Sequence, residues 1–369
     1  MKKNPLLYSF LFMLFSITIL DLVTPYKSFS DLENRNLTTK VDFTIDGLIN
    51  GSFTKKYEEL INDQFIGRDM WIDLKSRSEY MLGKIENNNI IYGKDNYLFD
   101  KFDNLNEERV ESNVNALNMF IKNTEAIGSD ISVMIVPSSY EIYKEKLPKG
   151  APLINQEAII NDIYNKLDGG RKLDVVKLMN ENKENQLYYK TDHHWNISGA
   201  YLAYKEYIES IGGKSIDLSS LQANEVQDFY GTFFSKAKPF NGVPDILTYY
   251  DIDNIEMSIG DEKYESLYDL SYLDKRDKYS IYLRGNNPLT IIKNNSLKNG
   301  KKLMVVKDSF ANSIIPFLTQ NFEEIHVVDL RSFSLKLSDY IKKEKFDDVL
   351  VLYNFVNFVN DTNLIKFKF

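Results

Sequence analysis

Short apolar segments alternate with amphipathic ones along much of the chain. Apolar runs of four to six residues predict buried strands at 131–136, 173–176, 303–306, 325–329 and 348–353. Segments with apolar residues at helical spacing predict helices at 106–126, 155–167, 197–211 and 334–344. Strands that alternate with helices in this way imply an α/β fold built on a mostly parallel, three-layer sheet.

Residues 217–295 interrupt this alternation. They are rich in Tyr, Asp, Asn and Ser and predict strands and loops inserted between two halves of the core. Two roles stay open for their aromatic side chains. They stack on sugar rings as one wall of a substrate groove, or they pack against one another as a β-rich lid.

The part of the chain before residue 100 predicts helices followed by a hairpin. Residues 53–84 have apolar residues at near-helical spacing, interrupted at Gly67-Arg68, so two helices joined by a turn are expected. Residues 90–92 and 97–99 flank a polar segment that begins at Gly93, which predicts a β-hairpin.

The amino terminus predicts a membrane anchor. Lys2 and Lys3 precede an uncharged apolar run at 6–20, and the segment reaches Thr24 before the chain becomes polar. Its length is close to the roughly 20 residues that cross a bilayer. We interpret residues 6–24 as an uncleaved anchor, with the lysines inside and the rest of the chain outside. A cleaved signal peptide is the alternative, although no typical A-x-A-like cleavage site follows.

These patterns divide the chain into five predicted parts. Residues 1–25 form a cytoplasmic tip and the anchor, and residues 26–85 form an extracellular tether with a helical segment. The core has a first half at 86–216 and a second half at 296–369, separated by the β-rich insertion at 217–295.

Composition narrows the classes of partner. The chain has 45 basic and 53 acidic residues, a net charge of −8, and no evident basic patch, which argues against a nucleic-acid partner. It has no cysteine, which excludes disulfides, thiolate metal sites and a cysteine nucleophile.

Two motifs carry candidate chemistry. Asp192-His193-His194-Trp195 uses two of the three histidines of the chain and places a carboxylate two residues before an imidazole, which it can orient and polarise. Ser309 follows the predicted strand 303–306, so it falls at the carboxyl edge of the sheet, where ligands and reacting groups gather in open α/β folds.

The order of these motifs resembles the DHHW and alginate O-acetyltransferase family. In that family a D-x-H-W motif precedes, by about a hundred residues, a strand that ends in Asp-Ser-Phe, as at 308–310 here. The resemblance extends to FSDLENRNL at 29–37, NDQFIGRDMW at 62–71 and IIYGKDNYLFD at 90–100. It implies a circularly permuted relative of the SGNH-hydrolase fold, in which the acid and the histidine precede the serine.

The resemblance also implies a role for each site residue. Ser309 is the expected nucleophile, His194 the base that activates it, and Asp192 the group that orients His194. The Ser309 backbone N–H is the expected oxyanion donor. Asn354 corresponds to the asparagine of the SGNH fold and is proposed as a second donor, with Asn357 as the fallback.

Each assignment has an alternative. Ser309 can instead cap the following helix beside Asp308. Ser138 and Ser139, after strand 131–136, can bind substrate or compete as the nucleophile. Trp195 either packs beneath the loop or stacks on a sugar.

The remaining histidines have structural roles in this interpretation. His193 is expected in a supporting role, because adjacent residues rarely point the same way, and His326 belongs to a strand of the core or its edge. A metal site at 192–194 is the chemical rival, but metal sites usually need a further ligand that the chain does not clearly offer, so we expect no metal and no cofactor.

The function that follows is a membrane-anchored O-acetyltransferase acting outside the cell on a polysaccharide acceptor. The resemblance implies that a multipass membrane-bound O-acyltransferase supplies the acetyl group. A carbohydrate acetyl esterase with the same triad and a non-catalytic glycan-binding surface protein are the alternatives.

Overall fold

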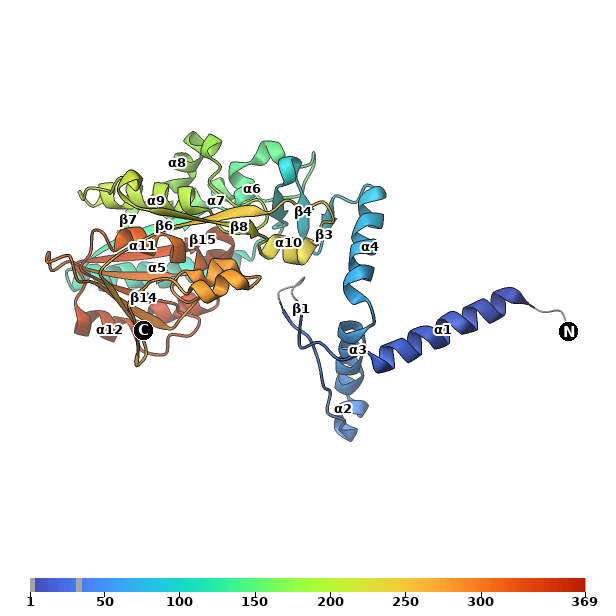
Figure 1. Cartoon of the computed structure of the whole chain (residues 1–369). Helices are drawn as coiled ribbons and strands as arrows, with labels where there is room; N and C mark the ends of the chain where they lie inside the picture. Colours follow the sequence, from blue (N-terminus) through green and yellow to red (C-terminus); the bar gives the residue numbers. More distant parts are fainter. Residues whose placement is uncertain (1–3, 31–34, 369) are drawn as a thin grey trace. The chain divides into compact units, whose positions relative to one another are not determined.

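The computed structural model describes residues 4–30 and 35–368 (Figure 1). Lys2 and Lys3, cited above as the charges before the anchor, lie outside the described residues, as does part of the segment at 29–37. The chain forms two compact units. The first contains Met1–Asn87 with Ser235–Gly242, and the second contains Asn88–Phe234 with Val243–Phe369.

The first unit is mainly helical. Its elements are α1 (Pro5–Val23), β1 (Phe29–Ser30), β2 (Arg35–Asn36), α2 (Ile45–Ile49), α3 (Ser52–Gln64), α4 (Arg68–Met81) and β3 (Glu86–Asn87). Helix α1 is long and apolar enough to cross a membrane, and none of it is buried. The two helices expected within 53–84 are confirmed as α3 and α4. Gly67 between them has a φ of 65°, a conformation that glycine adopts without strain.

The second unit is built on an eight-stranded mixed sheet. The strands of this unit are β4 (Ile90–Tyr92), β5 (Leu98–Asp100), β6 (Asp130–Val136), β7 (Arg171–Lys172), β8 (Ala223–Phe229), β9 (Asp245–Tyr250), β10 (Ile255–Ile259), β11 (Glu262–Tyr264), β12 (Leu289–Asn294), β13 (Lys302–Lys307), β14 (Glu324–Val328) and β15 (Asp348–Asn354). The large sheet has the order β11-β10-β12-β14-β13-β15-β6-β7. The strands from β14 to β7 are parallel, whereas β12, β10 and β11 are antiparallel.

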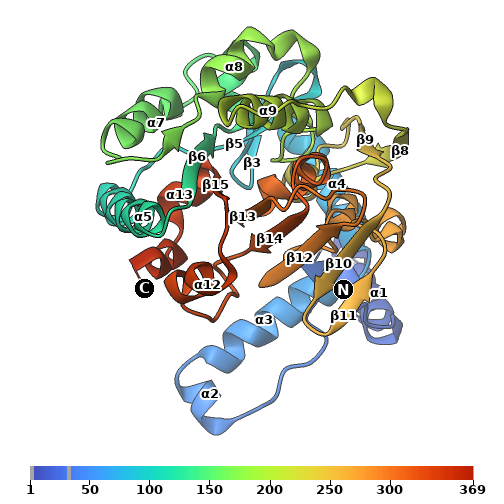
Figure 2. The same cartoon turned by 90° about the vertical axis from the view of Figure 1, so that its left-hand side faces the viewer.

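Helices flank this sheet. The α-helices of the remaining chain are α5 (Glu107–Ala126), α6 (Ser139–Ile142), α7 (Gln156–Asn165), α8 (Val175–Glu181), α9 (Ile197–Ser210), α10 (Thr232–Ala237), α11 (Ile315–Leu318), α12 (Leu337–Glu344) and α13 (Phe355–Asn360). The 3₁₀ turns are η1 (Lys94–Asn96), η2 (Lys144–Lys146), η3 (Lys183–Asn185), η4 (Leu218–Ser220), η5 (Leu270–Asp274), η6 (Lys278–Ile281), η7 (Ser309–Ser313) and η8 (Asn363–Lys368). Figure 2 shows α5 and α12 on one side of the sheet and α8 and α9 on the other.

The core lies between the sheet and these helices. Leu303, Met304, Val305 and Val306 of β13 are all fully buried, which explains the continuous apolar run of a central parallel strand. Each such side chain stabilises the fold by about 1.5–3 kcal/mol relative to an exposed one. The expected hairpin is confirmed as the antiparallel pair β4–β5.

The prediction of a strand at 173–176 is wrong. The chain forms the short strand β7 at Arg171–Lys172 and then begins helix α8 at Val175. Asp174 caps this helix by accepting the Lys177 backbone N–H at 3.1 Å. A short apolar run fits a buried helix face as well as a buried strand, and here the cap decides for the helix.

Residues 217–295 supply strands to the main sheet. Strand β12 pairs with β14, and β10 and β11 follow it outward, so this segment extends the sheet on its antiparallel side. Strands β8 and β9 form a separate antiparallel pair. Strands β10, β11 and β12 of this segment therefore belong to the same sheet as β13.

Candidate active site

The carboxyl ends of three parallel strands meet at one edge of the sheet. Lys307 at the end of β13 is paired with Leu352 of β15, and Asn354 at the end of β15 is paired with Val136 of β6. Ser309 lies just beyond β13, at the start of η7, and remains partly exposed. Strand β13 therefore presents Ser309 at the edge where the loops of an α/β sheet form sites.

Asp192, His194 and Ser309 form a continuous chain of hydrogen bonds. The His194 Nδ1 atom lies 2.6 Å from Asp192 Oδ1, and His194 Nε2 lies 2.8 Å from Ser309 Oγ. An ionised carboxylate only accepts, so Nδ1 carries the proton and Nε2 of the neutral ring accepts from the Ser309 hydroxyl. This is the arrangement of a carboxylate, a base and an activated hydroxyl.

Asp192 is held as a carboxylate. Its side chain is 2% exposed, accepts the His194 backbone N–H at 3.0 Å, and accepts the Thr232 backbone N–H at 2.7 Å. Burial alone would favour the neutral acid, but His193, His194 and these hydrogen bonds outweigh it and hold the Asp192 pKa well below its usual range. The charge needed to orient His194 is therefore present across the neutral range.

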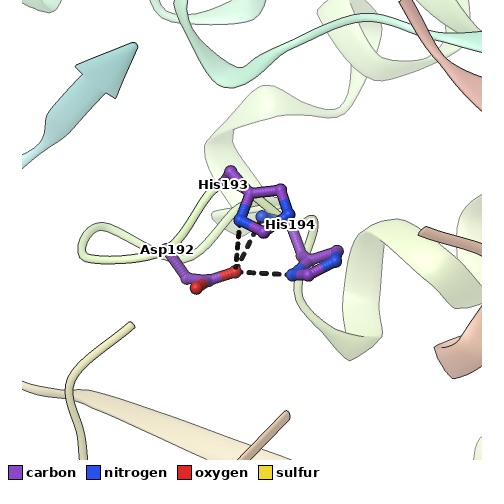
Figure 3. Close-up of side chains that lie close together, drawn as sticks. All are labelled: Asp192, His193 and His194. Atoms are coloured by element: carbon purple, nitrogen blue, oxygen red, sulfur yellow. Dashed lines mark hydrogen bonds and ion pairs between the residues drawn. The ribbon is translucent and has the colours of Figure 1, made fainter. Parts of the chain in front are cut away.

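His193 also faces Asp192, contrary to the expectation that adjacent side chains point apart. Figure 3 shows both imidazoles directed toward Asp192 Oδ1. His193 Nδ1 lies 3.4 Å from that oxygen and 2.7 Å from Thr232 Oγ1. The structure thus places His193 beside the carboxylate, where it adds to the favourable field around Asp192.

The loop that carries these residues is fixed at both ends. The buried Asp245 carboxylate accepts the backbone N–H groups of Lys190 and Thr191, at 2.9 and 2.8 Å, and the Thr191 hydroxyl at 2.6 Å. After the motif, the Asn196 side chain accepts the Ser198 and Gly199 backbone N–H groups and so caps α9. The imidazole is therefore presented by a packed loop rather than a loose one.

Tyr279 holds the other face of the site. Its ring stacks on His194 with centroids 3.7 Å apart and planes within 10° of parallel. Its hydroxyl donates a hydrogen bond to the Ser309 carbonyl oxygen at 3.1 Å. Because one side chain contacts both His194 and the backbone of Ser309, Tyr279 fixes the relative positions of these two residues.

Trp195 is part of the interior. It is 0% exposed, and its indole N–H lies 2.9 Å from both the Phe310 carbonyl oxygen and Ser313 Oγ. Of the two roles left open, packing beneath the loop fits this burial. No face of the ring is available to a sugar.

Asn354 and Asn357 contact Asp308. The Asn354 backbone N–H and the Asn357 side-chain amide each donate to Asp308 Oδ2 at 2.7 Å, and the Asn354 amide donates to the Val136 carbonyl at 3.1 Å. In the part of the chain that the structure describes, neither amide is hydrogen-bonded to Ser309. Asp308 in turn accepts the Phe310 N–H at 2.9 Å and so caps η7, the role considered above for Ser309.

Ser138 and Ser139 lie at the end of β6, and both are buried. The Ser138 backbone N–H donates to Gln156 Oε1 at 2.7 Å, and Ser139 begins α6. Both ring nitrogens of His194 are engaged, by Asp192 and by Ser309. This geometry favours Ser309 over either serine as the hydroxyl that the imidazole activates.

Asp192, His193 and His194 are also the candidate ligands of the alternative metal site. Their ligand atoms lie within 4.8 Å of one another. A metal ligand must offer a free lone pair, and on His194 one nitrogen carries the proton shared with Asp192 while the other accepts from Ser309. The donor set therefore suits proton transfer better than metal binding.

His326 is buried in β14, and its two ring nitrogens are hydrogen-bonded to Tyr340 and Glu324.

A family model for DHHW proteins matches residues 89–328, more than half of the chain. The chain belongs to the DHHW family. The matched segment contains Asp192–Trp195, residues 217–295 and Ser309.

Named relatives of this DHHW protein include alginate-related proteins. It is 24% identical over 190 residues to a probable alginate O-acetylase AlgJ of Pseudomonas fluorescens, covering 48% of this chain and 46% of that protein. The chain spans about half the length of the curated relatives it matches.

Two solved structures share its fold. A DHHW family protein from Eubacterium siraeum is 25% identical with a TM-score of 0.66, and the match covers 76% of this chain and 96% of that one. Bacillus cereus PatB1 is 24% identical with a TM-score of 0.64, and the match covers 76% and 99% of the two chains.

Three residues that shape the site were not predicted from the sequence: Gly231, Thr232 and Tyr279. All three come from the aromatic-rich residues 217–295. The available signal was the glycine within FYGTFF, since a glycine amid bulky residues marks a close approach of the backbone. A side chain at Gly231 would overlap Asp192, with its Cβ only 2.6 Å from the Asp192 Cα.

Gly231→Ala is therefore expected to disturb the site directly. The new methyl group forces Asp192 or the Gly231 segment to move, which misplaces His194 and lowers kcat for an activated ester by about 100-fold. Overpacking also lowers the free energy of unfolding by about 1–3 kcal/mol. Ester turnover and urea unfolding measure the two effects.

Gly93→Ala is the matched control. A Cβ at Gly93 would overlap the Phe99 ring in the β4–β5 hairpin, so this variant is also overpacked but leaves Asp192 untouched. It should lose stability and keep its kcat. Equal kcat losses in the two variants would contradict the assigned role of Gly231.

Proposed function

We propose that this protein is a membrane-anchored O-acetyltransferase that acts outside the cell and moves acetyl groups to polysaccharide hydroxyls through an acetyl-serine intermediate. The observation that carries the proposal is the hydrogen-bonded chain from Asp192 through His194 to Ser309. The name of a relative, probable alginate O-acetylase, supports acetyl as the transferred group and a polysaccharide as the acceptor.

The first half-reaction forms the intermediate. Ser309 Oγ attacks the acetyl carbonyl while His194 Nε2 takes its proton, and the Oγ–C bond forms as the bond to the donor breaks. His194 gives the proton to the departing group. Asp192 stabilises the imidazolium present between these steps. The Ser309 backbone N–H is the proposed donor to the oxyanion, and Asn354 with Asn357 as its fallback remain proposals for the second.

The second half-reaction returns the serine. A sugar hydroxyl attacks the acetyl carbonyl, His194 takes its proton, and the same proton returns to Ser309 Oγ as the acetyl–serine bond breaks. The scheme uses this chain's side chains and two substrates, so it requires no cofactor.

The placement of the protein is part of the proposal. Helix α1 supports attachment to the cell membrane, since it is long and apolar enough to cross it. A multipass membrane-bound O-acyltransferase is the proposed source of acetyl groups. The order of acid, histidine and serine along the chain supports a circularly permuted SGNH arrangement, with the parallel strands β14 to β7 as its core.

The domain divisions are proposed with it. Residues 86–216 and 296–369 supply the histidine and the serine, and residues 217–295 supply Gly231, Thr232 and Tyr279 around them. On this view the insertion completes the site.

A competition between water and sugar tests transfer against hydrolysis. Full-length protein in detergent is given p-nitrophenyl acetate with and without oligosaccharides of several classes, and acetylated sugar and free acetate are quantified by mass spectrometry. Acetylated sugar that requires Ser309 is the expected result.

Free acetate alone, with every sugar tested, would instead identify an acetyl esterase, an alternative favoured by the partial exposure of Ser309. No Ser309-dependent product of either kind would contradict the enzymatic proposal and favour a glycan-binding protein.

A further inference from the structure

The corner between α3 and α4 exposes large apolar side chains. Met70, Trp71 and Leu74 are 63%, 46% and 50% exposed, and Phe65 at the end of α3 is exposed as well. Met70 and Leu74 are four residues apart and so lie on one face of α4, with Trp71 beside them. Large neighbouring apolar side chains facing water indicate a surface that something covers.

Hydrogen bonds join this corner to the end of helix α1. Asp21, in the last turn of α1, accepts the Ile66 backbone N–H at 3.1 Å. The Gln64 side-chain amide donates to the Lys27 carbonyl oxygen and accepts the Lys27 backbone N–H, each at 2.9 Å. The corner is thus joined directly to the point where α1 ends.

An open hollow lies between them. Its volume is about 270 Å³, and its lining includes Thr24 from the end of α1 together with Phe65, Ile66 and Met70 from the corner. The apolar side chains of the corner therefore lie beside the carboxyl-terminal end of α1.

The position of α1 in a bilayer would determine the depth at which the corner lies. Asp21 is the first charged residue after the apolar run at 6–20, so in a bilayer-crossing helix it lies at the boundary between hydrocarbon and headgroups. Ile66 is hydrogen-bonded to Asp21 and so reaches the same boundary. Tryptophan is enriched at this depth, because its ring is apolar while its N–H finds polar partners.

We propose that the α3–α4 corner, formed by Phe65, Met70, Trp71 and Leu74, lies in the outer headgroup region of the bilayer. The corner serves as a second contact with the membrane and restrains the direction in which the chain leaves α1. This inference rests on the anchoring role of α1 within the proposed function, and it commits to lipid rather than to a protein partner as what covers the surface.

Tryptophan fluorescence tests the proposal in the intact protein. The chain has two tryptophans, and Trp195 is fully buried, so Trp71 reports on the corner. Full-length protein is reconstituted into vesicles whose lipids carry bromine either near the top of the acyl chain or near its end, and vesicle flotation measures insertion. Trp71→Phe supplies the control, because its remaining emission comes from Trp195.

The expected result is loss of Trp71 emission that is strongest with the shallow bromines and is absent in Trp71→Phe. Protein that floats with the vesicles but shows equal emission in all lipids would overturn the inference while leaving the anchor intact. A blue-shifted Trp71 without quenching would assign the surface to a protein contact and would equally overturn it. Protein that does not float would contradict both the anchor and the proposed membrane contact. It would leave the enzymatic proposal untouched, because Ser309-dependent acetyl transfer is measured separately in detergent.

Discussion

Ser309→Ala and His194→Ala are each expected to lower kcat for an activated acetyl ester by roughly six orders of magnitude. In the proposed mechanism Ser309 supplies the attacking oxygen, and His194 Nε2, which lies 2.8 Å from Ser309 Oγ, takes its proton. Without either partner the other has no function in the covalent step. Stopped assays with the purified full-length variants, compared with the uncatalysed rate, measure the loss.

Two comparisons sharpen this result. The double variant should be no slower than either single variant, since residues that act as a unit are not additive. Ser332→Ala is the matched serine control, because Ser332 is exposed in the loop after β14 and should keep full activity. Independent, multiplying losses in the double variant would contradict a shared step.

Asp192→Asn is expected to lower kcat by roughly four orders of magnitude with little change in shape. Asp192 accepts from His194 Nδ1 and so keeps Nε2 free to accept the Ser309 proton. An amide presents a donor at the same place and favours the wrong tautomer. The loss should fall on kcat rather than on KM, and a variant within about tenfold of the wild type would refute the role of the carboxylate.

The same variant has a pH-dependent effect on stability. The Asp192 pKa lies below its usual range in the folded protein, because the imidazoles and hydrogen bonds outweigh the burial that opposes ionisation. Its contribution to stability is present above the unfolded-state pKa of about 3.9 and is lost as pH falls through the lower folded-state pKa. The difference in unfolding free energy between wild type and Asp192→Asn should therefore shrink below about pH 4. Denaturant unfolding across acid pH measures it.

Local patterns predicted the elements that carry the site. The strand predicted at 303–306 placed Ser309 just beyond its end, and the helix predicted at 197–211 placed His194 just before its start, because each of these patterns extends over several neighbouring residues. The strand predicted at 173–176 failed for the same reason that makes short runs ambiguous, since Val175 and Val176 suit a buried helix face equally well.

The contacts that complete the site depend on distant parts of the chain. Tyr279 stacks on His194, Thr232 bonds Asp192, and Asp245 holds Thr191. No local period marks such pairs, because each side chain is placed by the sheet and its loops rather than by its neighbours in sequence. Strands were expected within 217–295, but the pairing of β12 with β14 in the main sheet was not predicted, since tertiary packing sets the partners of a strand.

Trapping the covalent intermediate tests most directly whether Ser309 is the nucleophile. Full-length wild type is mixed briefly with p-nitrophenyl acetate, quenched in acid, digested and analysed by mass spectrometry for peptides that contain Ser309. The expected result is the mass of one acetyl group on Ser309 in the wild type and none at this position in Ser309→Ala. Rapid ester turnover with the acetyl group on Ser138 or Ser139, or on no serine at all, would contradict it.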